Sequence, residues 1–195
     1  MAEEPSRGTL LAAGTLLVAT PRLADPNFER TVVLVLDHDE NGSLGVVLNR
    51  PSPVPVGEVL GDWQPMAASP GVLFHGGPVA TDSALAVAAL APGQGPDSDP
   101  VGFRRLFGAT GVVDLDTPTE LLAAAVGSVR VFAGYAGWGV GQLAAEIEEG
   151  SWYVVPAEGD DVFGPAPEGL WAHVLRRQPG ELAWVSTRPT DPTLN

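Results

Sequence analysis

The sequence contains no cysteine and no lysine, and each absence excludes a class of chemistry. Without cysteine there is no disulfide, no thiol nucleophile and no cysteine-bound zinc or iron–sulfur site. Without lysine there is no Schiff-base mechanism and no phosphate-binding lysine of the Walker type. A chain without cysteine fits a reducing compartment, so we expect a cytoplasmic protein.

Positive charge is also scarce. Ten arginines face 24 acidic residues, which gives a formal net charge of −14. Binding to nucleic acid or to an anionic membrane requires a basic face. Ten arginines scattered along the chain do not indicate such a face, so we expect neither kind of binding. No apolar run approaches the roughly 20 residues of a membrane span. The apolar run at residues 9–19 follows two acids and precedes Pro21-Arg22, a pattern that disfavours a signal peptide.

The length and the apolar content fit one domain with a real core. The chain has 195 residues, of which 45% are hydrophobic. Its 24 glycines and 19 prolines indicate a fold with many turns. We expect residues 1–8 to be disordered and residues 9–195 to form a single domain.

Local patterns predict a mixture of strands and helices. The runs Arg30–Leu36 and Ser43–Leu48 flank Asn41-Gly42, which is a strong signal for a β-hairpin. We expect Pro51–Pro55 to be irregular and Thr117 to cap a helix. Further strands are predicted at 14–20, 72–74, 107–115, 151–155 and 182–186, and helices at 56–63, 118–126, 139–149 and 167–177.

A glycine-rich stretch at residues 134–141 follows the apolar run 129–133 and precedes a helical pattern that ends at Gly150. We interpret it as a turn between strand and helix. Its glycines do not have the G-x-G-x-x-G spacing of a dinucleotide loop. Two interpretations stay open: the helix start binds an anion, or the glycines let Tyr135 and Trp138 pack across a tight turn.

Several polar residues are candidates for binding. Gln142, Glu146 and Glu149 form a stripe on the predicted helix, where acids serve either a partner or solubility. Arg50 follows a buried strand, and its guanidinium either clamps a carboxylate or phosphate or fastens a loop. His75 is the one histidine beside an unusual turn, Gly76-Gly77-Pro78.

Catalytic and metal motifs are incomplete. Asp37, Asp39 and Asn41 match the start of an EF-hand loop, but position twelve is Leu48 and the flanks are predicted strands. Ser43 lacks the spacing of a nucleophile elbow. The three histidines are widely spaced along the chain and form no histidine-pair metal motif. We therefore predict no metal, no cofactor and no catalytic set.

Short motifs in this order resemble the AlgH/YqgE family of bacterial proteins. The resemblance covers almost the whole chain and implies a single α+β domain with a branched, partly barrel-like mixed β-sheet surrounded by helices. It implies no settled activity, and the transcriptional-regulator label of some members does not rest on a DNA-binding module. The motifs are Ala19-Thr20-Pro21, Asp25-Pro26-Asn27-Phe28, residues 45–51, residues 75–79, Gly134-Tyr135-Ala136-Gly137-Trp138, Gly141-Gln142-Leu143 with Glu146, and residues 191–195.

We therefore predict a non-catalytic cytosolic protein that binds a partner protein or a small ligand, with a regulatory outcome. The alternatives are an enzyme that uses His75 as acid–base group with Glu146 as its partner, and a transcriptional regulator, which the net charge disfavours. Strand ends and turns are where rigid scaffolds carry binding residues. The predicted site consists of Asn49, Arg50, His75, Gly76, Gly77, Tyr135, Trp138, Gln142 and Glu146.

Overall fold

The computed structural model describes residues 9–95 and 99–188. The predicted disordered segment 1–8 and the family motif at 191–195 lie outside these residues. Among the described helices, none is long and apolar enough to cross a membrane.

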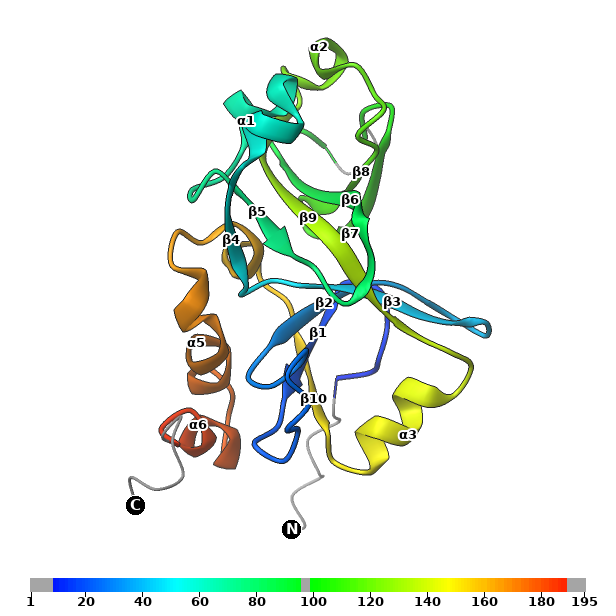
Figure 1. The fold of residues 1–195 in the computed structure, drawn as a ribbon, viewed down its shortest axis with the longest axis vertical. Helices are drawn as coiled ribbons and strands as arrows, with labels where there is room; N and C mark the ends of the chain where they lie inside the picture. The colour runs from blue at the N-terminus through cyan, green and yellow to red at the C-terminus, as the bar shows by residue number, and fades with distance from the viewer. Residues whose placement is uncertain (1–8, 96–98, 189–195) are drawn as a thin grey trace.

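The described chain forms one mixed sheet with short helices around it (Figure 1). The predicted α+β fold with a branched, partly barrel-like sheet is confirmed. The strands are β1 (Thr15–Ala19), β2 (Val32–Asp39), β3 (Gly42–Val47), β4 (Pro51–Pro55), β5 (Val72–His75), β6 (Val79–Leu90), β7 (Phe103–Phe107), β8 (Thr110–Val113), β9 (Val126–Trp138) and β10 (Trp152–Pro156). The α-helices are α1 (Val56–Val59), α2 (Thr119–Leu122), α3 (Gln142–Glu148), α4 (Gly159–Phe163), α5 (Leu170–Arg176) and α6 (Glu181–Val185), and the 3₁₀ helices are η1 (Gly61–Met66) and η2 (Pro167–Gly169).

Strand β9 joins the two halves of the sheet. The main path runs β10-β1-β2-β3-β9-β6-β8-β7, and β4 and β5 form a branch on β9. One edge of β9 pairs with β6. The other edge pairs with β5 in parallel at Phe132 and Ala133, and then with β3 in antiparallel register from Ala136 to Trp138. A single 13-residue strand therefore holds both the branch and the curled, half-barrel part.

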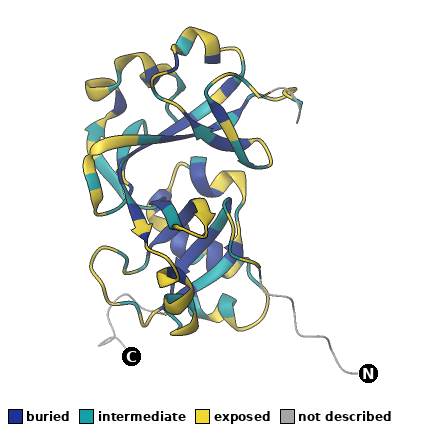
Figure 2. Ribbon diagram, turned by 90° about the vertical axis from the view of Figure 1, so that its right-hand side faces the viewer, coloured by how far each residue is buried: buried dark blue, intermediate teal, exposed yellow. Residues whose placement is uncertain are grey.

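The core follows from this topology. β1 and β2 read as near-continuous apolar runs because both faces are covered, and Leu16 and Leu34 are fully buried. Helix α5 packs on β1, and the indole N–H of Trp171 donates to the carbonyl of Ala19 at 2.8 Å. Figure 2 shows the buried residues concentrated on the strands of both halves, with exposed residues on the helices and loops around them.

The β2–β3 hairpin is confirmed, with Asp39 opposite Gly42. Gly42 has a φ of 142°, and a Cβ there would overlap the carbonyl oxygen of Trp138 on the neighbouring strand. The glycine of the turn signal is therefore required by the approach of β9 as well as by the turn itself.

Several other local predictions are also confirmed. The predicted strands at 14–20, 72–74 and 151–155 correspond to β1, β5 and β10. The predicted helix at 56–63 is found as α1 followed by η1, and the one at 167–177 is found as η2 followed by α5.

Three predictions of local structure were wrong because contacts with distant parts of the chain overrode the local sequence pattern. Pro51–Pro55 forms β4, because this strand pairs with β5 alone and an edge tolerates proline. The single strand predicted at 107–115 covers only the end of β7, a turn at Gly108 with a φ of 50°, and β8. The strand predicted at 182–186 is helix α6, whose apolar residues pack against α5.

The helix predicted at 118–126 was too long. Only Thr119–Leu122 is helical, and Val126 already pairs with Leu90 as the first residue of β9. The Thr117 side chain does not cap the helix, which begins after Pro118 without a side-chain cap. The long-range pairing of β9 with β6 takes residues that the local pattern assigns to the helix.

The glycine-rich stretch is mostly strand rather than turn. β9 continues through Gly134 to Trp138, and the turn is confined to residues 139–141. Gly134 has a φ of 74°, and a Cβ there would lie 2.7 Å from the carbonyl oxygen of Gly77. The backbone of residues 76–77 crosses β9 at this point, so Gly134 serves a backbone crossing and not the packing of aromatic rings.

Together with Gly77, Gly76 is one of the two tightest points of this crossing. Its N–H donates to Ala133 on β9, and its carbonyl accepts from Val47 on β3, at 2.9 and 2.8 Å. A Cβ at Gly76 would overlap the carbonyl oxygen of Gly134. Residue 76 thus connects the two strands where β9 changes partner.

We expect Gly76→Ala to lower the free energy of unfolding by ~3 kcal/mol, because the added methyl group has to displace backbone. Gly61→Ala is the matched control, since a Cβ at Gly61 meets nothing within 4 Å. Urea unfolding followed by circular dichroism measures both. Equal midpoints for the two variants would contradict this account of the crossing.

Candidate functional site

The carboxylate of Glu146 is the polar centre of the candidate site. Its Oε2 accepts hydrogen bonds from the indole N–H groups of Trp138 and Trp152, both at 2.9 Å. Its Oε1 accepts from the side-chain amide of Gln142 at 3.0 Å. Both oxygens of this half-buried carboxylate are thus occupied by donors from the protein itself.

Three elements bring these groups together. Trp138 ends β9, Trp152 begins β10, and Gln142 and Glu146 lie one turn apart on α3. The amide oxygen of Gln142 also accepts from the backbone N–H of Gly139 at 3.1 Å, which fastens the turn between β9 and α3. The predicted stripe on α3 therefore starts as an internal network and not as a free surface.

Phe28 covers this network from a loop far away in sequence. Its ring stacks on Trp138 at a centroid distance of 6.1 Å and meets the edge of Trp152 at 5.6 Å. The two indoles meet at 6.1 Å with an interplanar angle of 82°. Aromatic pairs in these geometries stabilise beyond the area that they bury. Trp152 was not among the predicted site residues, and no local motif marks it.

Arg50 and Asn49 hold the loop that carries Phe28. The guanidinium of Arg50 donates to the carbonyls of Pro26 and Glu29 at 2.9 and 3.1 Å. Asn49 donates to the carbonyl of Arg30 at 2.9 Å and accepts from a backbone N–H of β2 at 3.0 Å. Of the two roles considered for Arg50, these contacts support the fastening of a loop.

The same contacts hold an unusual backbone conformation. Arg30 has a φ of 54°, which is rare for a residue with a side chain. Its guanidinium lies over the ring of Trp171 at 4.0 Å, and its carbonyl is held by Asn49. Such a conformation persists where surrounding contacts over-determine it.

The remaining predicted residues lie elsewhere. Gly76 and Gly77 form the crossing over β9, and Tyr135 is half-buried against the main core. His75 is exposed at the end of β5, and its ring makes no hydrogen bond to any described residue. His75 pairs with Ala133, five residues and roughly 17 Å of strand before Trp138, so the structure does not bring it to Glu146.

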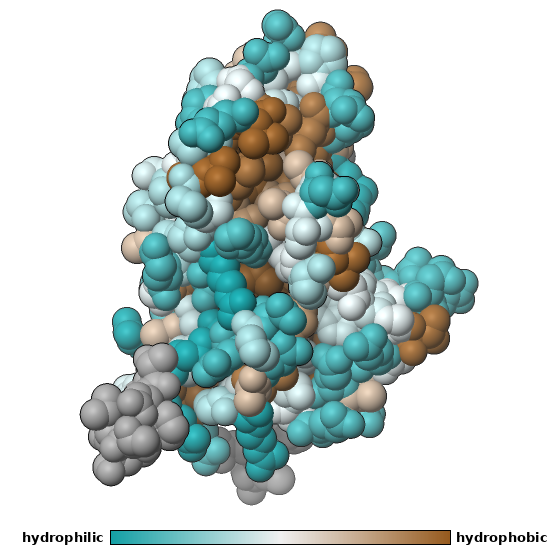
Figure 3. Space-filling view, viewed as in Figure 1, coloured by the Kyte–Doolittle hydropathy of each residue, from teal (hydrophilic) through white to brown (hydrophobic). Residues whose placement is uncertain are grey.

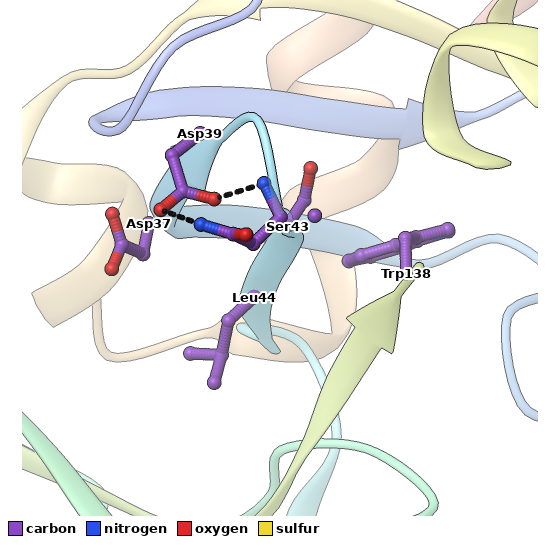
Figure 4. Close-up of a pocket in the computed structure, with 7 residues that line it drawn as sticks. Asp37, Asp39, Ser43, Leu44 and Trp138 are labelled. Atoms are coloured by element: carbon purple, nitrogen blue, oxygen red, sulfur yellow. Dashed lines mark hydrogen bonds between the residues drawn. The ribbon is translucent and has the colours of Figure 1, made fainter. Parts of the chain in front are cut away.

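A small hollow opens beside the network at the β2–β3 hairpin (Figure 4). Its volume is about 220 Å³. Asp39 accepts from the backbone and the side-chain amide of Asn41 at 2.7 and 3.2 Å. The backbone hydrogen bond from Asn41 is the main reason why the pKa of Asp39 is lowered. We call this the hairpin hollow; it is lined by Asp37, Asp39, Asn41, Gly42, Ser43, Leu44 and Trp138.

Metal-ligating side chains do not gather in the part of the chain that the structure describes. No group of three or more histidine, aspartate or glutamate side chains there has the arrangement of a metal site. The hairpin hollow is lined by two aspartates, Asp37 and Asp39, and by no histidine or glutamate that could act as a third metal ligand.

Comparison with known proteins shows which family this chain belongs to. Residues 16–183 match the family model described as AlgH-like. The chain belongs to the AlgH-like family. It is 64% identical over 182 residues to a UPF0301 protein of Streptomyces coelicolor, an alignment that covers 93% of this chain and 94% of that one.

Two solved structures share the AlgH-like fold of this chain. A crystal structure of a Corynebacterium diphtheriae protein matches with a TM-score of 0.88 and 36% identity, covering 94% of this chain and 95% of the other. The solution structure of the AlgH protein of Pseudomonas aeruginosa matches with a TM-score of 0.66 and 27% identity, covering 97% and 100%. The branched sheet is thus shared by distant members of the family.

We expect Glu146→Ala to destabilise the protein by about 3 kcal/mol, because it leaves two buried indole N–H groups without an acceptor. The emission of Trp138 and Trp152 should shift to the red as water reaches the indoles. Glu149→Ala is the control. Glu149 is the exposed C-cap residue of α3, and its side chain makes no hydrogen bond to described residues. Thermal unfolding and tryptophan emission spectra measure both effects. Indistinguishable spectra for the two variants would show that Glu146 does not hold the indoles.

Proposed function

We propose that this AlgH-like protein is a non-catalytic cytosolic protein that binds a partner protein, with a regulatory outcome. The hairpin hollow receives a cationic side chain of that partner. The observation behind this proposal is that two exposed aspartates, Asp37 and Asp39, line one hollow together with Trp138, which is 6% exposed. Carboxylates and an aromatic ring together suit a guanidinium or an ammonium group.

The size of the hairpin hollow favours a protein partner over a metabolite. Its volume of about 220 Å³ is below the 300–1,000 Å³ of typical small-molecule sites. One arginine or lysine head group fits such a space. The hairpin projects from the body of the molecule, and Figure 3 shows hydrophilic residues at its tip. Val140, in the turn after β9, is 76% exposed and offers an apolar contact beside Trp138.

Electrostatics supports the same kind of partner. Asp39 stays ionised well below neutral pH, because the hydrogen bonds from Asn41 stabilise its charged form. The formal net charge of −14 attracts basic surfaces from a distance and repels nucleic acid. This argues against a regulator that contacts DNA directly.

The contacts of the candidate acid–base pair do not support the enzyme alternative. Glu146 already accepts three hydrogen bonds from Trp138, Trp152 and Gln142. His75 lies on β5 opposite Ala133 of β9, and its ring makes no hydrogen bond to the described residues. A general acid–base pair has to reach the same substrate proton, and these two side chains are directed to different places.

The stiffness of the surroundings also suits recognition. Trp138 is held by Glu146 and by the ring of Phe28, and Arg50 in turn holds the loop of Phe28. A binding side that is already ordered loses little conformational entropy when a partner docks.

We expect Asp37→Asn with Asp39→Asn to reduce recovery of the partner about tenfold when the full chain captures proteins from its own cells. Asparagine keeps an oxygen that accepts from the N–H of Asn41, so the hairpin stays folded. Quantitative mass spectrometry of the eluates measures recovery.

The control is Glu58→Gln with Glu120→Gln, which changes the net charge equally on α1 and α2. Recovery by this control should equal that of the natural chain, and bound proteins should elute at raised salt. Equal recovery by both double variants, or no enriched protein at all, would rule out the hairpin hollow as the docking site.

A further inference from the structure

A second concave site lies on another part of the molecule, between α4, η2 and α5. Its volume is about 650 Å³, within the range of small-molecule sites. We call it the α4–α5 cleft. Its lining is mainly apolar and includes four polar residues, of which Asp161 is buried: Asp160, Asp161, Phe163, Gly164, Pro165, Ala166, Pro167, Gly169, Leu170, Ala172, His173 and Arg176.

The wall of this cleft is braced from behind by a buried arginine. Arg130 on β9 donates from Nε to the carbonyl of Val162 at 2.9 Å and from Nη2 to the carbonyl of Gly164 at 3.1 Å. Phe163, between these two anchored residues, lines the cleft. The guanidinium also lies over the ring of Phe74 at 4.2 Å. The cleft wall is therefore tied to the central strand of the sheet.

Arg130 carries a positive charge that no acid of the described chain neutralises. It is 2% exposed and has no ion-pair partner among the described residues, and its Nη1 is buried without a hydrogen bond. Buried arginine is rare unless it is paired. Burial lowers its pKa to about 10, so it stays cationic at neutral pH. The wall of the cleft therefore has a buried cation behind it.

The rim adds one unpaired cation. Arg176 is exposed on α5, and its side chain makes no hydrogen bond or ion pair to the described residues. Its neighbour Arg177 pairs with two carboxylates, those of Asp161 and Glu158, and so is not free for a ligand. His173 lines the same side of the cleft, on α5. Asp160 on α4 is the opposing exposed carboxylate, and it disfavours ligands that carry more than one negative charge.

We propose that the α4–α5 cleft binds a small molecule with an apolar body and a single carboxylate. The apolar body packs on Phe163, Leu170 and the proline-rich wall, and the carboxylate pairs with Arg176, on the side of the wall opposite to the buried guanidinium of Arg130. Arginine presents a fork of donors that matches a carboxylate. This site is separate in residues and in ligand chemistry from the hairpin hollow, and it does not depend on the function proposed for that hollow.

Octanoate is the probe for this proposal, titrated into the full-length protein and followed by backbone amide NMR shifts. Saturable shifts should concentrate at Phe163 and along α5. Octan-1-ol, which has the same apolar body without the charge, should bind about fivefold more weakly. Octylamine should bind more weakly still, because Arg176 repels its ammonium group.

Two variants separate the cleft from its charge. Arg176→Gln should weaken octanoate binding about fivefold and leave octan-1-ol unchanged, whereas Arg22→Gln, outside the cleft lining, should leave both unchanged. Ala172→Trp should fill the cleft and abolish the saturable shifts of both ligands. Shifts that map elsewhere, octanoate affinity that Arg176→Gln does not alter, or no saturation up to ~10 mM would each overturn the proposal.

Discussion

The sheet depends on one crossing at which two backbones approach more closely than side chains allow. Gly76 and Gly77 pass over Gly134 and Tyr135, where β9 exchanges β5 for β3 as its neighbour. Gly76 donates a hydrogen bond to β9 and accepts one from β3, and these replace the ladder bonds that the exchange would otherwise leave unmade. The branch, the half-barrel and the position of Trp138 at the end of β9 all follow from this crossing.

A second set of contacts explains why distant motifs of the family occur together in one chain. Arg50 and Asn49 fasten the loop at residues 25–31, and that loop places Phe28 on Trp138 and Trp152. Glu146 satisfies both indoles from a third element. Buried polar groups need partners, so the indoles, the carboxylate and the loop form one cooperative unit. This unit stiffens the base of the hairpin hollow.

Near the α4–α5 cleft, the buried charge of Arg130 is not paired with an opposite charge among the described residues. Arg130 meets carbonyl oxygens and an aromatic ring where a carboxylate would be usual. Carbonyl dipoles solvate the guanidinium without cancelling its charge. The two proposed sites therefore differ in the cations that they offer: the hairpin hollow is lined by aspartates without an arginine, while the α4–α5 cleft has Arg176 in its lining and Arg130 behind its wall. Residues of β9 contribute to both: Trp138 lines the hairpin hollow, and Arg130 braces the wall of the α4–α5 cleft from behind.

The sequence by itself determined the elements whose signals are local. Asn41-Gly42 between β-branched runs predicted the β2–β3 hairpin, and the apolar stripe of residues 170–175 predicted α5. The resemblance in motifs predicted the branched sheet. Tertiary structure decided the rest, because pairing energy is contributed by residues far away in sequence. It drew Pro51–Pro55 into β4, extended β9 through Gly134, placed Trp152 beside Trp138, and separated His75 from Glu146, which no local pattern predicts.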